Sequence, residues 1–599
     1  MSGVRKNNAT NGKSVDRALV SSTNFADFCR ELSILYRIKL PEPSGPVTKG
    51  FLTGLLENPR DHPWGPLLRA RHICRRTRLS IAGSLNSFCK TLPGSPPDLE
   101  SYMTSMSSLA PACDPDYLNF CTESVRQMFP VGWDRGWRSA VLGTCASSSS
   151  CRSATRAQGG ARRVMLRKRV EFLQTCMGIR RVPIPAFRRL AVAPCGGKNR
   201  IISVSPEESI QLLPLHRLMY GRLSKTTWLL RGEADPSSFF PDFAYREDEV
   251  FVSGDFKSAT DNLPIDVSEA ILHQVLRNCR FVPKSVQTEA LRSLRCCFND
   301  CSSGIECAPQ RRGQLMGNYL SFPLLCIQNF LAFSFLVGKD TPVRINGDDI
   351  VFRAAPSVAK RWTEGIDHLG LSLSVGKTMI CSRFFSLNSS YFDAKRETGV
   401  PILRASLLYR PIDDATSFAG RVSRVAVGWP KGVGSALKVA LVKRFSSEIR
   451  GCQRSLSAMG LGLNRREIGA SGFARWERFY RSMPNERAPP GLMEVRGGIP
   501  PSWRHVPCPL GGEDDPGFQR ALVRWAWRFP LRVVRQRRYW QAVRLGTIAF
   551  TPEESSPRLV HLLSKVGLRG AGKRGVRGWV LMGRMPLTPR VQKKVWRKT

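Results

Sequence analysis

The stretch VRINGDDIVF, residues 343–352, places an alternating apolar run on each side of Gly347-Asp348-Asp349. A period of two residues indicates a strand with one buried face, and glycine beside aspartate is typical of a tight turn. The stretch therefore predicts a β-hairpin with two adjacent carboxylates at its tip. Such a pair is either a solvated surface turn or part of a divalent-metal site, and the tripeptide alone does not separate the two.

A second acidic segment favours the metal site. The sequence GDFKSATD, residues 254–261, follows the apolar run VFV at residues 250–252, which is typical of a buried strand. Pro264 and the helical spacing of the apolar side chains in residues 267–275 predict a helix after it. We therefore expect Asp255 to lie at a strand-to-helix turn that holds its carboxylate rigidly.

The charge of the chain indicates an anionic partner. The 599 residues include 91 Lys and Arg against 47 Asp and Glu, which gives a formal net charge of +44. Such an excess repels itself unless an anion lies against it, and a phosphate backbone is the commonest such anion. We expect nucleic acid as the partner, with a basic protein that has no such ligand as the alternative.

The cysteines and apolar runs argue against a secreted or membrane-spanning protein. The 18 cysteines are scattered without a CxxC pair, and the cluster at residues 296–307 lacks zinc-type spacing and a neighbouring histidine. We expect reduced thiols in an intracellular compartment. The most apolar run, residues 324–337, contains Gln328 and Asn329 and is shorter than the roughly 20 residues that a membrane span needs. The N-terminus has no apolar signal-peptide core, and a mitochondrial address stays open.

Composition divides the chain into four parts. Residues 1–145 predict a mostly helical N-terminal region, and the Ser-, Ala- and Gly-rich residues 146–160 predict a flexible linker. Residues 161–410 interleave strands and helices and contain all the motifs. Residues 411–599 are predicted to be mostly helical and are strongly basic.

Two basic residues precede the acidic segments. In CGGKNRIISV, residues 195–204, Lys198 and Arg200 occupy alternate positions at the start of a predicted strand. Period-two geometry places them on one face, where both could grip a triphosphate. The alternative is the exposed basic face of an ordinary hairpin.

A glycine-bearing loop lies between the two acidic segments. It has the sequence RRGQLMGNYLSFP, residues 311–323, and leads into the apolar run. Gly317 would let the backbone approach a ribose or a template base, and Ser321 could offer a hydroxyl group. Beyond the predicted hairpin, LGLSLSVGKT at residues 369–378 contains Lys377, which by residue type alone is a solvated surface lysine.

Taken in order, these segments resemble motifs F, A, B, C and D of viral RNA-dependent RNA polymerases. The matching positions are Lys198 with Arg200, Asp255, Gly317, Asp348 and Lys377. The sequences of these segments, DFKSATDNLP, GQLMGNYLSFPLL and NGDD, are most similar to those of the ourmia-like and botourmiavirus branch. This branch is related to narnaviruses, mitoviruses and RNA phage replicases. The resemblance covers residues 188–392.

The resemblance implies an α+β right-hand fold of fingers, palm and thumb, in which the palm carries an antiparallel sheet. Fingers and palm would occupy residues 161–410, an extension of the fingers residues 1–145, and a thumb with a basic RNA-binding region residues 411–599. Asp255 and Asp348 would ligate two Mg²⁺ ions, or Mn²⁺, with Asp349 as a weaker ligand. Such a site is expected to be weak or distorted when empty, because the carboxylates repel one another.

The remaining motif residues would bind the nucleotide. The resemblance assigns the incoming phosphates to Lys198 and Arg200, the ribose 2′-hydroxyl to Asp261, and protonation of pyrophosphate to Lys377. Gly317 and Ser321 would line the nucleotide site.

Two departures limit this transfer. In many plus-strand RNA virus polymerases the second motif A aspartate follows the first by five positions. Here Asp261 follows Asp255 by six, which is the spacing of the phage and narnavirus-like group. The asparagine that many relatives place four residues after the motif B hydroxyl is Leu325 here, and Asn329 lies one helical turn further on.

The C-terminal region has a basic pattern of its own. Arginines recur every fourth residue, at Arg520, Arg524, Arg528 and Arg532, among several aromatic residues. A helix would align them in a stripe, although Pro530 would kink it. The stripe suits a sequence-tolerant RNA surface, and a solvated helix is the alternative.

The sequence thus predicts template-directed RNA synthesis that replicates a small viral RNA genome. The expected partners are RNA template and product, nucleoside triphosphates and the genomic RNA as a ribonucleoprotein, in the host cytoplasm or the mitochondrion. One alternative is a non-catalytic protein that coats RNA. Another is a reverse transcriptase, which would have a bulky aromatic residue where Thr260 and Asp261 stand.

Overall fold

The computed structural model describes residues 10–41, 47–70, 72–110, 113–300, 305–374, 378–410, 415–452, 454–482, 503–505 and 596–598. The chain divides into two compact units. Unit 1 comprises residues 1–142 and 146–409, and unit 2 comprises residues 143–145 and 410–599. Unit 1 contains the strands and helices that carry most of the motif residues.

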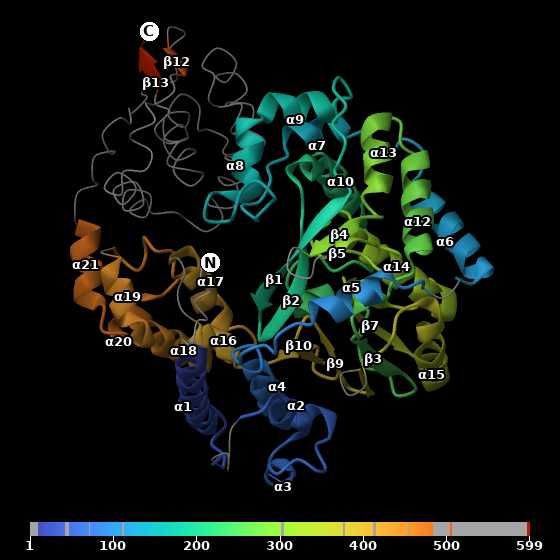
Figure 1. Ribbon diagram of the computed structural model, residues 1–599. Helices are drawn as coiled ribbons and strands as arrows, with labels where there is room; N and C mark the ends of the chain where they lie inside the picture. Colours follow the sequence, from blue (N-terminus) through green and yellow to red (C-terminus); the bar gives the residue numbers. More distant parts are fainter. Residues whose placement is uncertain are drawn as a thin grey trace, which may run out of the picture. The chain divides into compact units, whose positions relative to one another are not determined.

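A four-stranded antiparallel sheet carries the acidic residues (Figure 1). Its strand order is β6 (Val343–Asn346), β7 (Asp349–Ala354), β3 (Val250–Gly254) and β8 (Met379–Cys381). Asn346 pairs with Asp349 and Ile345 with Ile350, which confirms the hairpin predicted for residues 343–352. The expected buried strand before Asp255 is β3.

Helices cover this sheet because their apolar faces need a partner. The apolar run forms α14 (Ser321–Val337), and most of its residues are buried. The Phe333 ring lies 5.0 Å from that of Phe352 on β7, which in turn lies 5.0 Å from Trp362 of α15 (Pro356–Gly365). The helix α14 is therefore a packing element. Across the described residues no helix has the length and apolarity to cross a bilayer.

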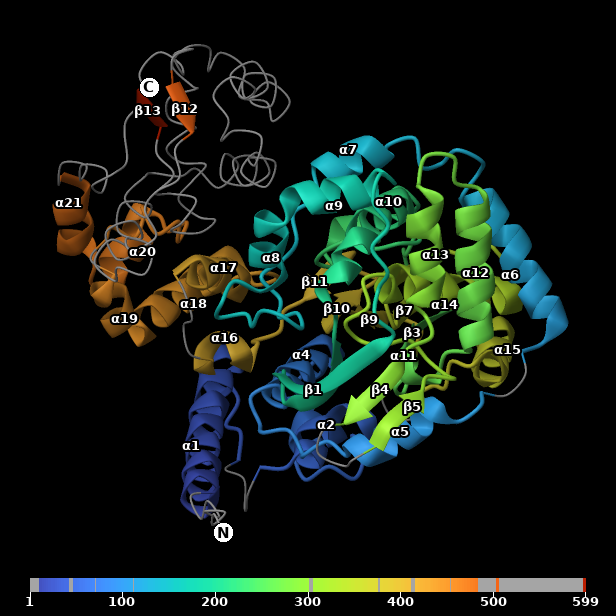
Figure 2. The same cartoon turned by 45° about the horizontal axis from the view of Figure 1, so that its top comes forward.

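A second four-stranded sheet has the order β2-β1-β4-β5. Strand β1 (Phe187–Cys195) pairs antiparallel with β2 (Lys198–Val204) and parallel with β4 (Cys297–Asp300), beside β5 (Ile305–Pro309). Lys198 and Arg200 are both exposed, at alternate positions of β2 as expected. Helices α6 (Pro115–Met128), α12 (Ile265–Arg277) and α13 (Lys284–Arg292) lie side by side on one flank of unit 1 (Figure 2).

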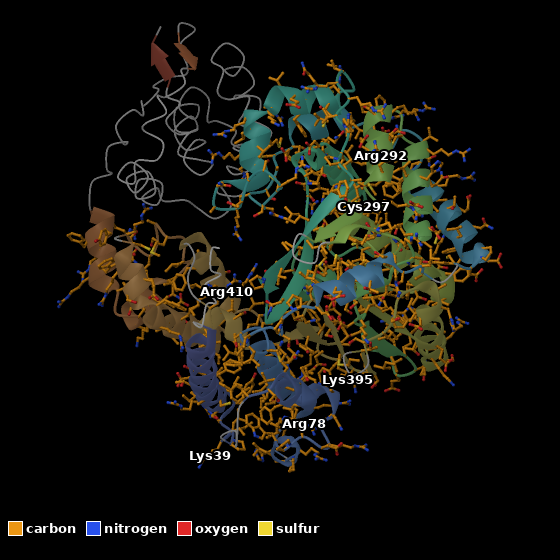
Figure 3. All side chains as sticks on the ribbon, in the orientation of Figure 1. Lys39, Arg78, Arg292, Cys297, Lys395 and Arg410 are labelled. Atoms are coloured by element: carbon orange, nitrogen blue, oxygen red, sulfur yellow. The ribbon has the colours of Figure 1, made fainter. Side chains whose placement is uncertain are left out.

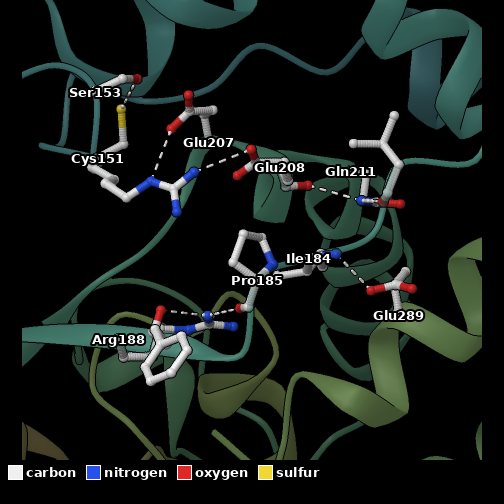
Figure 4. Close-up of polar contacts among 12 residues, drawn as sticks. Cys151, Ser153, Ile184, Pro185, Arg188, Glu207, Glu208, Gln211 and Glu289 are labelled. Carbon is white, nitrogen blue, oxygen red and sulfur yellow. Dashed lines mark hydrogen bonds and ion pairs between the residues drawn. The ribbon is translucent and has the colours of Figure 1, made fainter. Parts of the chain in front are cut away.

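Ion pairs and hydrogen bonds attach the segment before β1 to the rest of unit 1 (Figure 4). The Arg152 guanidinium lies 3.9 Å from Glu207 and 3.3 Å from Glu208 on the 3₁₀ helix η1 (Glu207–Leu212). The Ile184 backbone N–H donates to Glu289 on α13 at 2.7 Å. Residues 146–160, for which composition predicts a linker, lie within unit 1, and the N–H of Arg152 donates to the Ser205 carbonyl at 3.0 Å.

The N-terminal helices also belong to unit 1. Hydroxyl groups of α4 accept hydrogen bonds from the chain after β11: Leu403 N–H donates to Ser84, and Ala405 N–H donates to Ser87, both at 3.0 Å. Leu403 and Ala405 follow a three-stranded sheet of order β11-β10-β9. The N-terminal elements are α1 (Thr10–Tyr36), α2 (Lys49–Glu57), α3 (Gly65–Leu68), α4 (Arg75–Phe88), α5 (Leu99–Ser107) and α7 (Trp137–Leu142), and the strands are β9 (Phe384–Leu387), β10 (Ser390–Asp393) and β11 (Thr398–Val400).

The other elements of unit 1 are short. They are α8 (Gly160–Arg167), α9 (Arg169–Cys176), α10 (Leu213–Leu223), η2 (Pro236–Ser238), α11 (Ala259–Asn262), η3 (Ile366–Leu369) and α16 (Ala405–Tyr409). Unit 2 contains α17 (Ala415–Val425), α18 (Lys431–Arg444), α19 (Ser446–Gly451), α20 (Arg465–Ala470), α21 (Ala474–Ser482), β12 (Trp503–His505) and β13 (Trp596–Lys598). The mixture of helices and sheets confirms the expected α+β class.

The surface of unit 1 carries many basic side chains, among them the exposed Lys39, Arg292 and Lys395 (Figure 3). The cysteines with described side chains are free thiols, and several of them, such as Cys121, Cys176 and Cys326, are buried. Lys377 and the four arginines from Arg520 to Arg532 lie outside the described residues.

Candidate active site

The acidic doublet lies at the turn between β6 and β7, and α14 supports this turn. Gly347 has φ +68°, and a Cβ added there would come within 3.0 Å of the Phe322 ring. The side-chain amide of Asn329, which is 0% exposed, donates to the Gly347 carbonyl at 3.0 Å. The left-handed conformation and the close ring explain why glycine precedes the two aspartates.

The backbone fixes Asp255 next to the doublet. Gly254 pairs with Ile350, so the end of β3 lies beside the start of β7. Beyond it, the Ser374 N–H donates to the Asp255 carbonyl, and the Lys257 N–H donates to the Ser372 carbonyl, both at 2.8 Å. Asp255 is thus held between β7 on one side and residues 372–374 on the other, as expected for a rigid strand-to-helix turn.

The three carboxylates share one electrostatic environment. Burial raises the pKa of Asp348, and the negative charge of Asp255 raises it further. Burial raises the pKa of Asp349 to about 7, with added contributions from the charges of Asp348 and Asp255. The charge of Asp255 thus opposes the ionisation of both members of the doublet, which is the behaviour of carboxylates gathered for a cation.

The donor set fits a hard divalent cation, because carboxylate oxygens are the ligands that Mg²⁺ and Mn²⁺ prefer. Among the described residues, however, no three His, Cys, Asp or Glu side chains are already arranged as a metal-binding group.

Basic side chains from the second sheet reach the same site. The charges of Arg200 and Lys198 both lower the pKa of Asp348, against the larger effect of burial. The hairpin that carries them turns at Gly196-Gly197, and a Cβ on Gly197 would lie 2.1 Å from the Cys89 carbonyl. Lys49 donates to the Gly197 carbonyl at 2.7 Å, so the N-terminal helices support this hairpin.

Asp261 lies on α11, next to the glycine-bearing loop. Burial raises its pKa, while the Thr260 hydroxyl and the charges of Arg200 and Arg312 lower it. The Gln314 N–H donates to the Thr260 carbonyl at 2.7 Å, which holds the loop against α11. The charge of Arg200 thus lowers the pKa of both Asp261 and Asp348.

Gly317 and Ser321 are packed against the protein in this structure. Gly317 has φ +117°, and a Cβ there would lie 2.2 Å from the Ser203 carbonyl on β2. The buried Ser321 hydroxyl donates to the Leu315 carbonyl at 2.9 Å. The requirement for glycine at position 317 therefore comes from contact with β2, a cause that the sequence does not reveal.

Two further groups act on Asp349, and no sequence motif points to either of them. The Asn388 backbone hydrogen bond and the charge of Lys90 both lower the Asp349 pKa, against burial. Lys90 also donates to the Ser389 hydroxyl at 3.1 Å, and Asn388 and Ser389 form the β9–β10 turn with φ +53° and +57°. The pair Asn-Ser between apolar runs signals a turn, but only the fold brings this turn and Lys90 to the doublet.

Comparison with known proteins identifies relatives of this segment. Residues 163–398 match the family described as Mitovirus RNA-dependent RNA polymerase. The RNA-dependent RNA polymerase of Ourmia melon virus is 32% identical over 243 residues, which cover 35% of this chain and 28% of that protein. The RNA-directed RNA polymerase of Cryphonectria parasitica mitovirus 1 is 32% identical over 142 residues, which cover 23% and 16%. The matched segments thus span less than a third of either relative.

Among solved structures, the RNA-dependent RNA polymerase of a human picorbirnavirus aligns with a TM-score of 0.44 and 12% identity, over 62% of this chain and 79% of that one. The sequence matches alone show that the central segment is related to ourmia-like and mitovirus polymerases.

Proposed function

We propose that this chain, whose central segment is related to ourmia-like and mitovirus RNA-dependent RNA polymerases, copies RNA into RNA for a small viral genome. One observation carries the proposal. Asp255 and the doublet Asp348-Asp349 meet on one sheet, and Lys198 and Arg200 approach them from the other. Adjacent acidic and basic groups are what nucleotidyl transfer from a triphosphate requires.

In this proposal the carboxylates of Asp255 and Asp348, with Asp349 as the weaker partner, hold two Mg²⁺ or Mn²⁺ ions. When bound, the metal supplies a lowered pKa for the RNA 3′-hydroxyl and compensates the charge of the departing pyrophosphate. Lys198 and Arg200 orient the triphosphate from β2, and Arg200 also reaches Asp261. Asp261 accepts a hydrogen bond from the ribose 2′-hydroxyl, which selects ribonucleotides.

Three further assignments rest on the resemblance alone. Lys377 donates the proton to pyrophosphate, Gly317 and Ser321 shape the nucleotide site, and the arginines from Arg520 to Arg532 track RNA. The oxygen of the Ser321 hydroxyl can accept a hydrogen bond while the hydroxyl continues to donate to the Leu315 carbonyl.

The right-hand arrangement assigns a role to each part of the chain. The sheet β6-β7-β3-β8 with α12 and α14 is the palm, and the sheet that carries Lys198 and Arg200 belongs to the fingers, with residues 1–145 as their extension. Residues 411–599 form the thumb and a basic RNA-binding region. The partners are RNA template and product, nucleoside triphosphates and the genomic RNA as a ribonucleoprotein, in the host cytosol or mitochondrion.

Primer extension tests the proposal directly. The full chain is incubated with an RNA template, a labelled RNA primer and Mg²⁺, and ribonucleotides and deoxynucleotides are offered separately. We expect ribonucleotide incorporation by the wild type and by Asp340→Asn, a control at an exposed carboxylate before β6. Asp348→Asn should lose at least a hundredfold in rate, because it removes one metal-binding charge.

Each contrary outcome identifies an alternative. Preference for deoxynucleotides would indicate a reverse transcriptase. Tight RNA binding without synthesis by wild type, Asp340→Asn and Asp348→Asn alike would indicate an RNA-coating protein.

A further inference from the structure

An aromatic cluster flanks the acidic turn on the side of α14 and α10. The Phe322 ring, at the start of α14, is the ring that a Cβ on Gly347 would approach to 3.0 Å. The Tyr220 ring of α10 meets it edge to face, with centroids 5.4 Å apart and planes at 72°. The guanidinium of Arg231 lies 5.2 Å from the Tyr220 centroid. Phe322 thus adjoins the residue that precedes Asp348, and it is linked through Tyr220 to the Arg231 cation.

Phe322 is one of two partly exposed aromatic side chains of α14. The other, Phe335, is 36% exposed and packs against Tyr117 and Phe120 of α6. Phe322 is 38% exposed, whereas Phe330 is 7% and Phe333 is 0% exposed. A single exposed apolar residue needs no explanation in a soluble protein. An exposed ring that packs edge to face on a second ring, over which a cation lies, has at the edge of an acidic turn the composition of a surface that receives a base.

The third ring of the cluster is held in a fixed orientation. His216 stacks on Tyr220 with centroids 5.9 Å apart and planes at 27°, and its Nδ1 lies 2.6 Å from the Tyr319 carbonyl. The Nδ1–H therefore donates, and Nε2 is left as the acceptor. Burial lowers the His216 pKa, and the charges of Arg217 and Arg231 lower it further, against the hydrogen bond to the Tyr319 carbonyl, which raises it. The imidazole thus stacks on Tyr220 in an orientation that the Tyr319 carbonyl fixes.

We propose that Phe322, Tyr220 and Arg231 form a stacking platform for an unpaired nucleobase of the RNA strand that lies beside the acidic turn. This inference rests on the proposed function for the identity of the strand. Every base offers a π-face to the exposed Phe322 ring, and the Arg231 cation pairs with the adjoining phosphate. A base at this place belongs either to the template or to the 3′ end of the product, and the chemistry of recognition is the same.

Abasic RNA tests the platform without requiring synthesis. The affinity of the full chain is measured by fluorescence anisotropy in EDTA, with primer–template RNA that is intact, abasic at the primer 3′ end, or abasic in the first unpaired template position. We expect wild type to bind one of the two abasic RNAs about tenfold more weakly than intact RNA, because one base stack is lost. The RNA that shows this penalty identifies the strand.

Variants then connect the penalty to the platform. Phe322→Ala should bind intact and abasic RNA equally, and Phe322→Tyr should restore the penalty. Arg231→Gln, at an exposed position where folding is not at risk, should reduce it by several-fold. Phe281→Ala, at a ring that is 51% exposed on the loop between α12 and α13, is the matched control and should keep the full penalty.

Two results would overturn the platform: a wild type with no abasic penalty, or a full penalty in both Phe322→Ala and Arg231→Gln. Because binding is measured without metal, either result can occur in a chain that still extends primers. Conversely, the penalty can persist in a chain that fails to extend them, so the two proposals fail separately.

Discussion

At the scale of single residues, the clearest consequence of folding is the ionisation of Asp349. An isolated aspartate is fully charged at neutral pH, whereas burial and the charges of Asp348 and Asp255 raise the Asp349 pKa to about 7. Lys90 and the Asn388 backbone oppose this effect. The folded chain therefore holds a proton on Asp349 that the unfolded chain has released above about pH 4.

This difference predicts a pH-dependent stability in the absence of metal. A raised carboxyl pKa favours the folded state at low pH, and its contribution is lost as pH rises toward 7. Between about pH 5 and pH 8, the free energy of unfolding in EDTA should fall by on the order of 1 kcal/mol more for wild type than for Asp349→Asn. Urea denaturation of both proteins measures this, and equal pH profiles would contradict the raised pKa. Adding Mg²⁺ near pH 8 should stabilise wild type more than Asp349→Asn, because the variant keeps Asp255 and Asp348 but lacks the weaker third ligand.

At the scale of elements, the helix α14 both buries the sheet and shapes the acidic turn. Most of its side chains pack in the core, as the apolar run predicts. Asn329, which by sequence was only a residue one turn beyond the motif position, donates to the Gly347 carbonyl. Its neighbour Gln328, 2% exposed, donates instead to the Ser268 hydroxyl on α12 at 2.7 Å. Two adjacent buried side-chain amides thus donate hydrogen bonds to different elements, one to the β6–β7 turn and the other to α12.

This pair permits a matched experiment. Asn329→Ala removes the side-chain donor to the Gly347 carbonyl, and Gln328→Ala removes one of the hydrogen bonds of the Ser268 hydroxyl, which keeps those to Gln314 and Pro264. Each loss should lower the free energy of unfolding by about 1–3 kcal/mol. Only Asn329→Ala releases the turn that carries Asp348. We expect its kcat in primer extension to fall at least tenfold with little change in nucleotide KM, because a small misplacement of reacting groups is costly. Similar kcat values for the two variants would show that Asn329 acts on stability alone.

At the scale of the whole molecule, the net charge of +44 dominates encounters with polyanions. A cationic surface that binds RNA displaces counterions from the phosphates, and the free energy of this release falls as salt rises. The affinity of the full chain for single-stranded RNA should therefore decrease linearly with salt on a double-logarithmic plot. Its slope should be about −0.7 per phosphate neutralised. An uncharged-backbone analogue of the same sequence should show almost no slope, and a flat response with natural RNA would remove charge as the driving force.

Local chemistry explains why part of the fold was predictable. The alternating runs around Gly347 require a strand on each side of a turn, and the run VFV requires a buried strand before Asp255, so β6, β7 and β3 followed from side-chain periodicity. The same periodicity placed Lys198 and Arg200 on one face of β2. These strands and the shared face of Lys198 and Arg200 depend on residues that are neighbours along the chain. They can therefore be predicted without knowledge of the tertiary structure.

The gathering of the site depended on contacts between distant segments. No periodicity shows that Gly317 abuts Ser203, that Asn329 holds Gly347, or that Lys90 reaches Asp349. These relations arise from the pairing of β3 with β7 and from the packing of α4 and α14. The sequence by itself determined which carboxylates and cations are available and on which strands they lie. Only the tertiary structure decided which of them share one electric field, because that field depends on distance in space and on burial.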